Sequence, residues 1–174
     1  MITIRAASPA DAPGIARVHV DSWRTTYAGI VSAEFLANLS YEKSEARNRA
    51  FMTEPGVNRH FFVAGDESGR IVGFATGGPV RGDMPGFDGE LYGIYLLKEY
   101  QRQGIGGRLV RALADALAGD GFRSMLVWVL ADNPARGFYE ALGGRFVRQQ
   151  TITIGGQELA EVAYGWEDIR SLLR

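Results

Sequence analysis

The 174-residue chain contains no cysteine, and that absence removes several kinds of chemistry at once. No disulfide framework, thiolate metal site or cysteine nucleophile can form. The chain has only two histidines, so we expect no multi-histidine metal site and no bound metal. It also lacks the G-x-S-x-G motif of a serine nucleophile elbow. Neither Lys43 nor Lys98 follows a G-x-x-x-x-G run, which excludes a P-loop.

Long apolar runs and an excess of one charge are also missing. The longest uninterrupted apolar stretch covers residues 125–131, which is too short to cross a bilayer. The first five residues alternate in polarity and show no signal-peptide core, so we expect a cytoplasmic protein without a membrane partner. Nineteen basic and twenty acidic residues give a net charge of −1, and we expect no nucleic-acid partner.

Apolar residues make up 46% of the chain, which is typical of a folded globular protein, and we expect one domain over residues 1–174. Ser8, Ser32 and Ser40 are expected to cap helices, and the glycine- and proline-rich residues 77–89 to be irregular. A further loop is expected at residues 55–56. Periodicity and turn residues predict strands at 2–6, 60–65, 71–77, 90–97, 123–130, 146–154 and 159–166, and helices at 9–27, 33–39, 41–52, 104–118 and 134–142.

The most specific segment is residues 95–108, where a strand enters a glycine-rich turn and then an amphipathic helix. Unpaired backbone N–H groups at a helix N-terminus bind anions, and glycine lets the anion approach the backbone. Arg102 and Arg108 add positive charge suited to a diphosphate. Leu109 stands where a dinucleotide fingerprint requires glycine, which excludes that class. On the residues alone, a turn with glycines for close packing remains an alternative.

Three motifs resemble the GNAT N-acetyltransferase superfamily. Gln101-x-x-Gly104-x-Gly106 is similar to the Q/R-x-x-G-x-G/A motif that binds the pyrophosphate of acetyl-CoA in that family. Residues 90–96 resemble the family's fourth strand, and residues 133–144 resemble its N-x-x-A-x-x-F-Y-x-x-L-G-F motif. The last match has two departures. Asn133 lies six rather than seven residues before Tyr139, and Gly144 replaces the final phenylalanine, with Phe146 nearby.

The resemblance implies an α+β fold with a mixed, mostly antiparallel sheet of about six to seven strands, flanked by about four to five helices. It also implies acetyl-CoA as the co-substrate and a possible homodimer. The implied cofactor-binding residues are Ile94, Tyr95 and Leu96 for pantetheine, Gln101, Arg102, Gln103, Gly104, Ile105, Gly106 and Gly107 for pyrophosphate, and Asn133.

The expected chemistry is transfer of acetyl to a primary amine, on a small molecule or a protein, within a ternary complex. Tyr139 matches the family position whose hydroxyl protonates the departing thiolate. Glu90 is the candidate general base, and alternation is expected to place Glu90, Tyr92, Ile94 and Leu96 on one strand face. Both assignments have structural alternatives, a core aromatic for Tyr139 and a solvated strand-end carboxylate for Glu90.

The acceptor side is indicated by Trp23 and Tyr27, which lie four residues apart on one helix face. With Gly29 and Ile30 they resemble the W-x-x-x-Y-x-G-I stretch that walls the acceptor cleft in many bacterial GNAT proteins. These two residues and Tyr92 are therefore candidate substrate-binding residues, although core packing would also explain them. Two rival hypotheses are a non-catalytic acyl-CoA-binding module and a phosphate-binding protein unrelated to coenzyme A.

Overall fold

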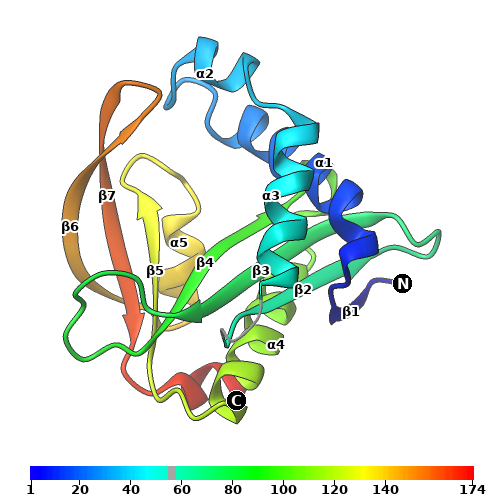
Figure 1. Cartoon of the computed structure of the whole chain (residues 1–174). Coiled ribbons are helices and arrows are strands. Elements are labelled where there is room, and N and C mark those ends of the chain that lie inside the picture. Colours follow the sequence, from blue (N-terminus) through cyan, green and yellow to red (C-terminus); the bar gives the residue numbers. More distant parts are fainter. Residues whose placement is uncertain (55–57) are drawn as a thin grey trace.

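The computed structural model describes residues 1–54 and 58–174 (Figure 1). The loop expected at residues 55–56 lies outside the described residues. The described chain forms seven strands and five α-helices, in agreement with the expected fold class. The strands are β1 (Thr3–Ala6), β2 (His60–Gly65), β3 (Ile71–Pro79), β4 (Gly89–Leu96), β5 (Met125–Leu130), β6 (Arg145–Ile154) and β7 (Gln157–Trp166); the helices are α1 (Ala12–Thr26), α2 (Ala33–Ala37), α3 (Tyr41–Thr53), α4 (Ile105–Gly119) and α5 (Arg136–Ala141).

The seven strands form one sheet in the order β1-β2-β3-β4-β5-β7-β6. Every neighbouring pair is antiparallel except β4 and β5. These two strands pair in parallel over only three residues each, Gly89–Leu91 with Met125–Val127. Beyond that point they separate, and Figure 1 shows β4 and β5 diverging from a common lower end. The sheet is therefore split at its centre.

Helices cover both faces of the sheet. In Figure 1, α1 and α3 lie across one face, and α4 lies on the opposite side. The predicted apolar face of α1 is buried through Ile15 and Val18, and that of α4 through residues that include Leu109 and Leu113. These side chains belong to one core cluster with Leu91 and other residues of the sheet. Both long helices thus pack against β4, one of the two strands that border the split.

A bulge in β4 corrects the predicted alternation. Thr76 of β3 lies opposite Gly93 and the next residue, Gly77, lies opposite Leu91, so Tyr92 is an extra residue in β4. Glu90 and Tyr92 share a face, since both contact Arg81. Leu96 instead points toward α4, where its side chain and that of Leu109 both border Gly73. The prediction that Ile94 and Leu96 share the face of Glu90 is therefore wrong, because a bulge breaks the period of two.

The segment expected to be irregular from residue 77 begins later than predicted. β3 continues through Gly77 and Gly78 to Pro79, which pair with Leu91, Glu90 and Gly89. Glycine is required in this strand because a Cβ at Gly77 would lie 2.5 Å from the Glu90 carbonyl oxygen. Proline is tolerated because it is the last residue of the strand. Glycine content alone therefore misplaced the end of β3.

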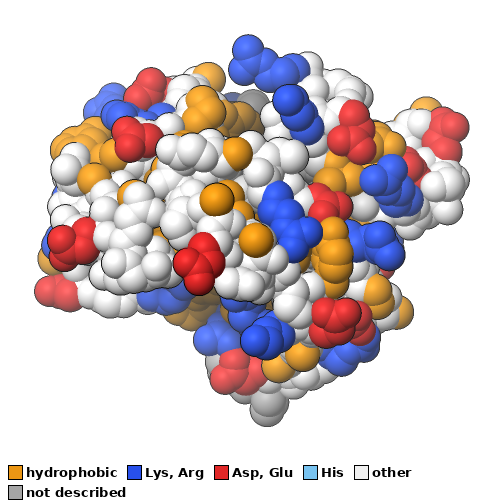
Figure 2. Space-filling model, turned by 90° about the horizontal axis from the view of Figure 1, so that it is seen from above, with side chains coloured by type: hydrophobic (Ala, Val, Ile, Leu, Met, Phe, Trp, Pro, Cys, Tyr) orange, Lys and Arg blue, Asp and Glu red, His pale blue; other side chains and the backbone are white. Residues whose placement is uncertain are grey.

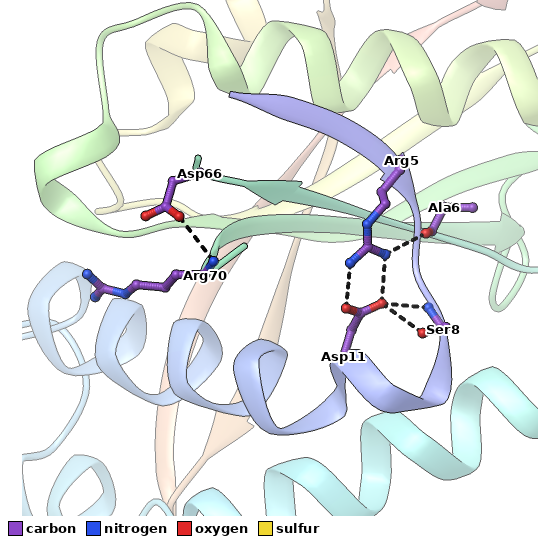
Figure 3. A network of polar contacts seen from close by, with 6 residues as sticks. All are labelled: Arg5, Ala6, Ser8, Asp11, Asp66 and Arg70. Atoms are coloured by element: carbon purple, nitrogen blue, oxygen red, sulfur yellow. Dashed lines mark hydrogen bonds and ion pairs between the residues drawn. The ribbon is translucent and has the colours of Figure 1, made fainter. Parts of the chain in front are cut away.

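The helix caps follow the sequence signals. Ser32 Oγ accepts from Phe35 N–H and Ser40 Oγ accepts from Lys43 N–H, as expected. At Ser8 the carboxylate of Asp11 accepts from the Ser8 N–H, and a 3₁₀ turn at Pro9–Asp11 precedes α1. Figure 3 shows Asp11 also bridged by two nitrogens of Arg5 in β1, at 2.7 and 2.8 Å. The Arg5 contacts lower the pKa of Asp11 to about 2 and tie β1 to the start of α1.

His19 on α1 provides a pH-dependence test of this packing. Burial, with the nearby Arg47 charge, lowers the pKa of His19 to about 4, and its Nδ1 lies 2.9 Å from Ser44 Oγ. An unfolded histidine titrates near 6.5, so the unfolded state takes up its proton first. The contribution of His19 to the free energy of unfolding should therefore be at its maximum above about pH 6.5. It should fall toward pH 4, by roughly 3 kcal/mol in total. Asp11 acts at lower pH, between its unfolded value of 3.8 and about 2.

Urea unfolding at pH 7 and pH 5 checks this expectation. The wild type should lose stability between the two values, whereas His19→Gln should lose markedly less, because glutamine does not titrate. An equal loss in both proteins would show that His19 is not responsible.

Candidate active site

The split in the sheet opens into a cleft of about 570 Å³. Its walls come from the diverging halves of β4 and β5, the C-terminal end of α1, the first turn of α4 and the segment leading into α5. The edge of β4 from Tyr92 to Leu96 has no strand partner on the β5 side. An extended ligand can therefore add to this edge as a strand would. Ile94, Tyr95 and Leu96 line the cleft along this edge, where the sequence predicted pantetheine.

The glycine-rich turn forms one end of the cleft. Gly104 has a left-handed backbone (φ +76°) and precedes the first helical residue of α4. Within the described chain, the backbone N–H groups of residues 102–107 donate to no protein acceptor. Gln101 and Gln103 fold back on the preceding segment, where their side-chain amides donate to the carbonyls of Leu96 and Glu99. The turn therefore presents unused donors at the positive end of a helix dipole, as an anion site requires.

The charges around this turn differ from the prediction. Arg102 lines the cleft, but Arg108 does not, because its Nη2 donates to the Ile2 carbonyl at 2.9 Å. The expectation that Arg108 supplies charge to the anion site is not met. Lys98, which sequence reasoning missed, lines the cleft instead. Its position three residues before Gln101, at the end of a strand, was the available signal.

Tyr139 lies at the base of the cleft and is almost fully buried. Its ring packs between Phe138, at 5.3 Å, and Tyr164, at 6.4 Å between ring centroids. Within the described chain the hydroxyl makes no protein hydrogen bond, and burial of the side chain raises its pKa above the ordinary value. The group is therefore a neutral donor at physiological pH, with its hydrogen bond available to a ligand. Tyr139 is therefore both a packed core aromatic and a cleft residue, so its packing does not exclude a role as proton donor.

Glu90 is not the solvated carboxylate that one hypothesis expected. Its side chain is 1% exposed and pairs with Arg81, whose side chain is 64% exposed. The backbone N–H of Arg81 donates to Oε2 at 2.9 Å, and its Nη2 donates to Oε1 at 2.6 Å. The Arg81 guanidinium also lies 4.5 Å from the ring centre of Tyr92, which lines the cleft. Glu90 thus fixes an arginine beside the cleft without lining it.

Of the three predicted acceptor residues, Tyr27 and Tyr92 line the cleft and Trp23 does not. Tyr27 lines the cleft, and its hydroxyl accepts from the Asn133 amide at 3.4 Å. Asn133 is buried, lines the cleft and accepts from the Ala135 N–H at the start of α5. The Trp23 ring packs against the Tyr27 ring at a tilted angle, with 4.6 Å between the ring centroids. Burial raises the pKa of Tyr27.

Two further cleft residues escaped sequence reasoning. Trp128 lines the cleft from β5, and its signal was a lone tryptophan in an otherwise aliphatic buried strand. Ser22 lines it from α1 with a buried hydroxyl that has no hydrogen-bond partner in the described structure. No helix of the described chain is long and apolar enough to cross a membrane, and its His, Asp and Glu side chains form no cluster that could hold a metal ion.

The comparisons with known proteins agree with this geometry. The sequence model of the Acetyltransferase (GNAT) family matches residues 21–144, and the chain belongs to that family. It is 45% identical to an uncharacterized N-acetyltransferase of Bacillus subtilis, YuaI, over 99% of this chain and 96% of the relative. It is 28% identical to an L-methionine sulfoximine/L-methionine sulfone acetyltransferase of Pseudomonas aeruginosa, over 81% of this chain and 78% of the relative.

A solved structure shares both fold and cofactor class. The phosphinothricin acetyltransferase of Sinorhizobium meliloti in complex with acetyl-CoA superposes with a TM-score of 0.69 at 25% identity, covering 95% of this chain and 87% of that one. The chain is therefore an acetyl-CoA-dependent N-acetyltransferase, and the cleft between β4 and β5 fits its co-substrate. The hypothesis of a phosphate-binding protein unrelated to coenzyme A is wrong.

Proposed function

We propose that the enzyme transfers acetyl directly from acetyl-CoA to the primary amine of a small polar molecule, within a ternary complex. The observation that carries this proposal is the Tyr139 hydroxyl, which makes no protein hydrogen bond in the described chain and belongs to a side chain that lines the same cleft as the anion-binding turn. Without cysteine, the chain offers no thiol for an acyl-enzyme step. Residues 1–174 are proposed to act as one N-acetyltransferase domain, since β1 and β7 join the same sheet.

Each part of the cleft has a proposed task. The free N–H groups of residues 102–107, with Lys98 and Arg102, bind the pyrophosphate. The open edge of β4 at Ile94, Tyr95 and Leu96 pairs with pantetheine. Tyr139 donates its hydrogen bond to the sulfur as the C–S bond breaks. Asn133 holds Tyr27 and the start of α5 in place, so we propose an indirect role for it in binding the cofactor.

The acceptor is proposed to carry an anionic group close to its amine. Arg81 stacks on Tyr92 at the cleft, and its Nη1 has no partner in the part of the chain that the structure describes. This nitrogen is available to a carboxylate of the acceptor. The name of one similar protein points the same way, since L-methionine sulfone and L-methionine sulfoximine are amino-acid derivatives.

The general base assigned to Glu90 stays a prediction. Its contacts with Arg81 support a positioning role, because they hold the guanidinium over Tyr92. The homodimer and the cytoplasmic location also stay predictions. The face in Figure 2 shows acidic and basic side chains interspersed, with no large area of one charge.

An assay of CoA thiol release tests the proposal. Acetyl-CoA is incubated with the enzyme and single amines from a panel of L-methionine sulfone, L-methionine sulfoximine, unmodified amino acids, spermidine and a peptide with a free N-terminus. We expect turnover with at least one amino acid or amino-acid derivative. Turnover with the peptide alone would move the acceptor to protein amino groups, and acetyl-CoA binding without turnover of any amine would favour the non-catalytic module.

A further inference from the structure

A carboxylate with an unused oxygen lies on β7, beside the strand that borders the cleft. Glu161 of β7 pairs opposite Leu130 of β5 and opposite Gln150 of β6. Cross-strand partners point to the same face of a sheet, and side chains two residues apart share a face. Glu161 therefore shares its face with Trp128, which precedes Leu130 by two residues and lines the cleft.

The contacts of Glu161 leave it half engaged. The Gln150 amide donates to Oε1 at 2.6 Å, and Oε2 has no hydrogen-bond partner in the described residues. The side chain is half-buried, so it is neither freely solvated nor closed off. Its negative charge contributes to raising the pKa values of Tyr27 and Arg81. Tyr27 lines the cleft, and Arg81 lies over Tyr92, which also lines it. The charge of Glu161 therefore acts on groups at the cleft and beside it.

Two other carboxylates in this region are already occupied. Glu90 accepts from the backbone and side chain of Arg81 through both of its carboxylate oxygens. Asp21 of α1 accepts from the Tyr41 hydroxyl at 2.6 Å. Glu161 has an oxygen left for a ligand. Trp128, on the same face of the sheet, lines the cleft, and aromatic faces also favour a cation.

We propose that Glu161 binds the ammonium group of the acceptor and takes its proton, an assignment that rests on the proposed acetyl transfer to an amine. The proton passes from the ammonium nitrogen to Glu161 Oε2 and on to solvent. The freed nitrogen lone pair then forms the C–N bond as the C–S bond breaks. The second N–H proton leaves to solvent, while the departing sulfur is protonated from Tyr139, which regains a proton from solvent. Amine and acetyl-CoA thus give amide and CoA thiol in balance.

Glu161→Gln tests this role, with Glu158→Gln as the matched control. Glu158 is exposed on the same strand, opposite Thr153. With the most reactive amine of the panel at pH 7, kcat/KM of Glu161→Gln should fall about 100-fold or more, the usual effect of losing a general base. Acetyl-CoA affinity and Tm should not change. The deficit should shrink at pH 9, because a much larger fraction of the acceptor amine is then neutral without help from a base.

The outcomes separate this inference from the proposed function. A defect confined to Glu161→Gln that shrinks at high pH supports it, as does partial rescue by Glu161→Asp. Wild-type turnover with Glu161→Gln as active as Glu158→Gln overturns the role of Glu161 and leaves acetyl transfer intact. A defect of equal size at pH 7 and pH 9 assigns Glu161 a structural role and overturns the inference. If the wild type binds acetyl-CoA but acetylates no amine of the panel, both proposals fail together.

Discussion

Tyr139→Phe should lower kcat by about 100-fold or more while acetyl-CoA binds with unchanged affinity. The substitution removes only the hydroxyl, and the ring can keep its packing between Phe138 and Tyr164. Burial keeps the pKa of this hydroxyl above its ordinary value. At neutral pH the substitution therefore removes a hydrogen-bond donor and not an anion. Steady-state CoA release and calorimetric titration with acetyl-CoA measure the two quantities separately.

Tyr164→Phe is the matched control for this prediction. Its ring stacks on Tyr139, but its hydroxyl donates to Glu140 at 2.7 Å and accepts from Arg136 at 3.1 Å. We expect kcat of this variant to stay within a few-fold of wild type. Full turnover by Tyr139→Phe, or an equal loss in both variants, would contradict the assignment of Tyr139 as the proton donor.

Gly106→Val should weaken acetyl-CoA binding by about 100-fold or more, which corresponds to roughly 2.7 kcal/mol. A Cβ at this position would lie 3.2 Å from two ring carbons of Phe138 and 3.9 Å from Ile94 Cδ1. The added side chain would therefore occupy the space between α4, α5 and β4 where the diphosphate must approach the N–H groups. Calorimetric titration with acetyl-CoA checks the prediction directly.

Gly119→Ala serves as the control, because a Cβ at the end of α4 meets no atom within 4 Å. Acetyl-CoA affinity should not change in this variant. Circular dichroism of Gly106→Val should show a folded protein, so that weak binding reports the cleft and not unfolding. Wild-type affinity in folded Gly106→Val would place the diphosphate elsewhere.

Local signals in the sequence predicted most of the fold. Serine caps, apolar periodicity and glycine turns located the helices and both hairpins, because each signal acts within a few residues. The order β5-β7-β6 and the separation of β4 from β5 depend on pairings between distant segments, so no local pattern predicted them. The bulge at Tyr92 was missed for a related reason, since the extra residue is defined only by its partner strand.

The site was predicted best where it is built from backbone. A turn that presents N–H groups to an anion needs glycine at fixed spacing, and Gln101, Gly104 and Gly106 show that spacing in the sequence. The charged side chains were predicted less well. Nothing near Arg108 in the sequence indicates a bond to Ile2, and nothing near Glu90 indicates the partner that Arg81 provides across the β3–β4 loop.

The most direct test of the account is a structure of the enzyme crystallised with acetyl-CoA. We expect the diphosphate to lie on the N–H groups of residues 102–107 and pantetheine to run along β4 from Leu96 toward Tyr92. The thioester sulfur should lie within hydrogen-bond reach of the Tyr139 hydroxyl, at about 3.5 Å. A sulfur far from Tyr139 would rule out this tyrosine as the proton donor, and a diphosphate bound away from the turn would rule out the turn as the anion site.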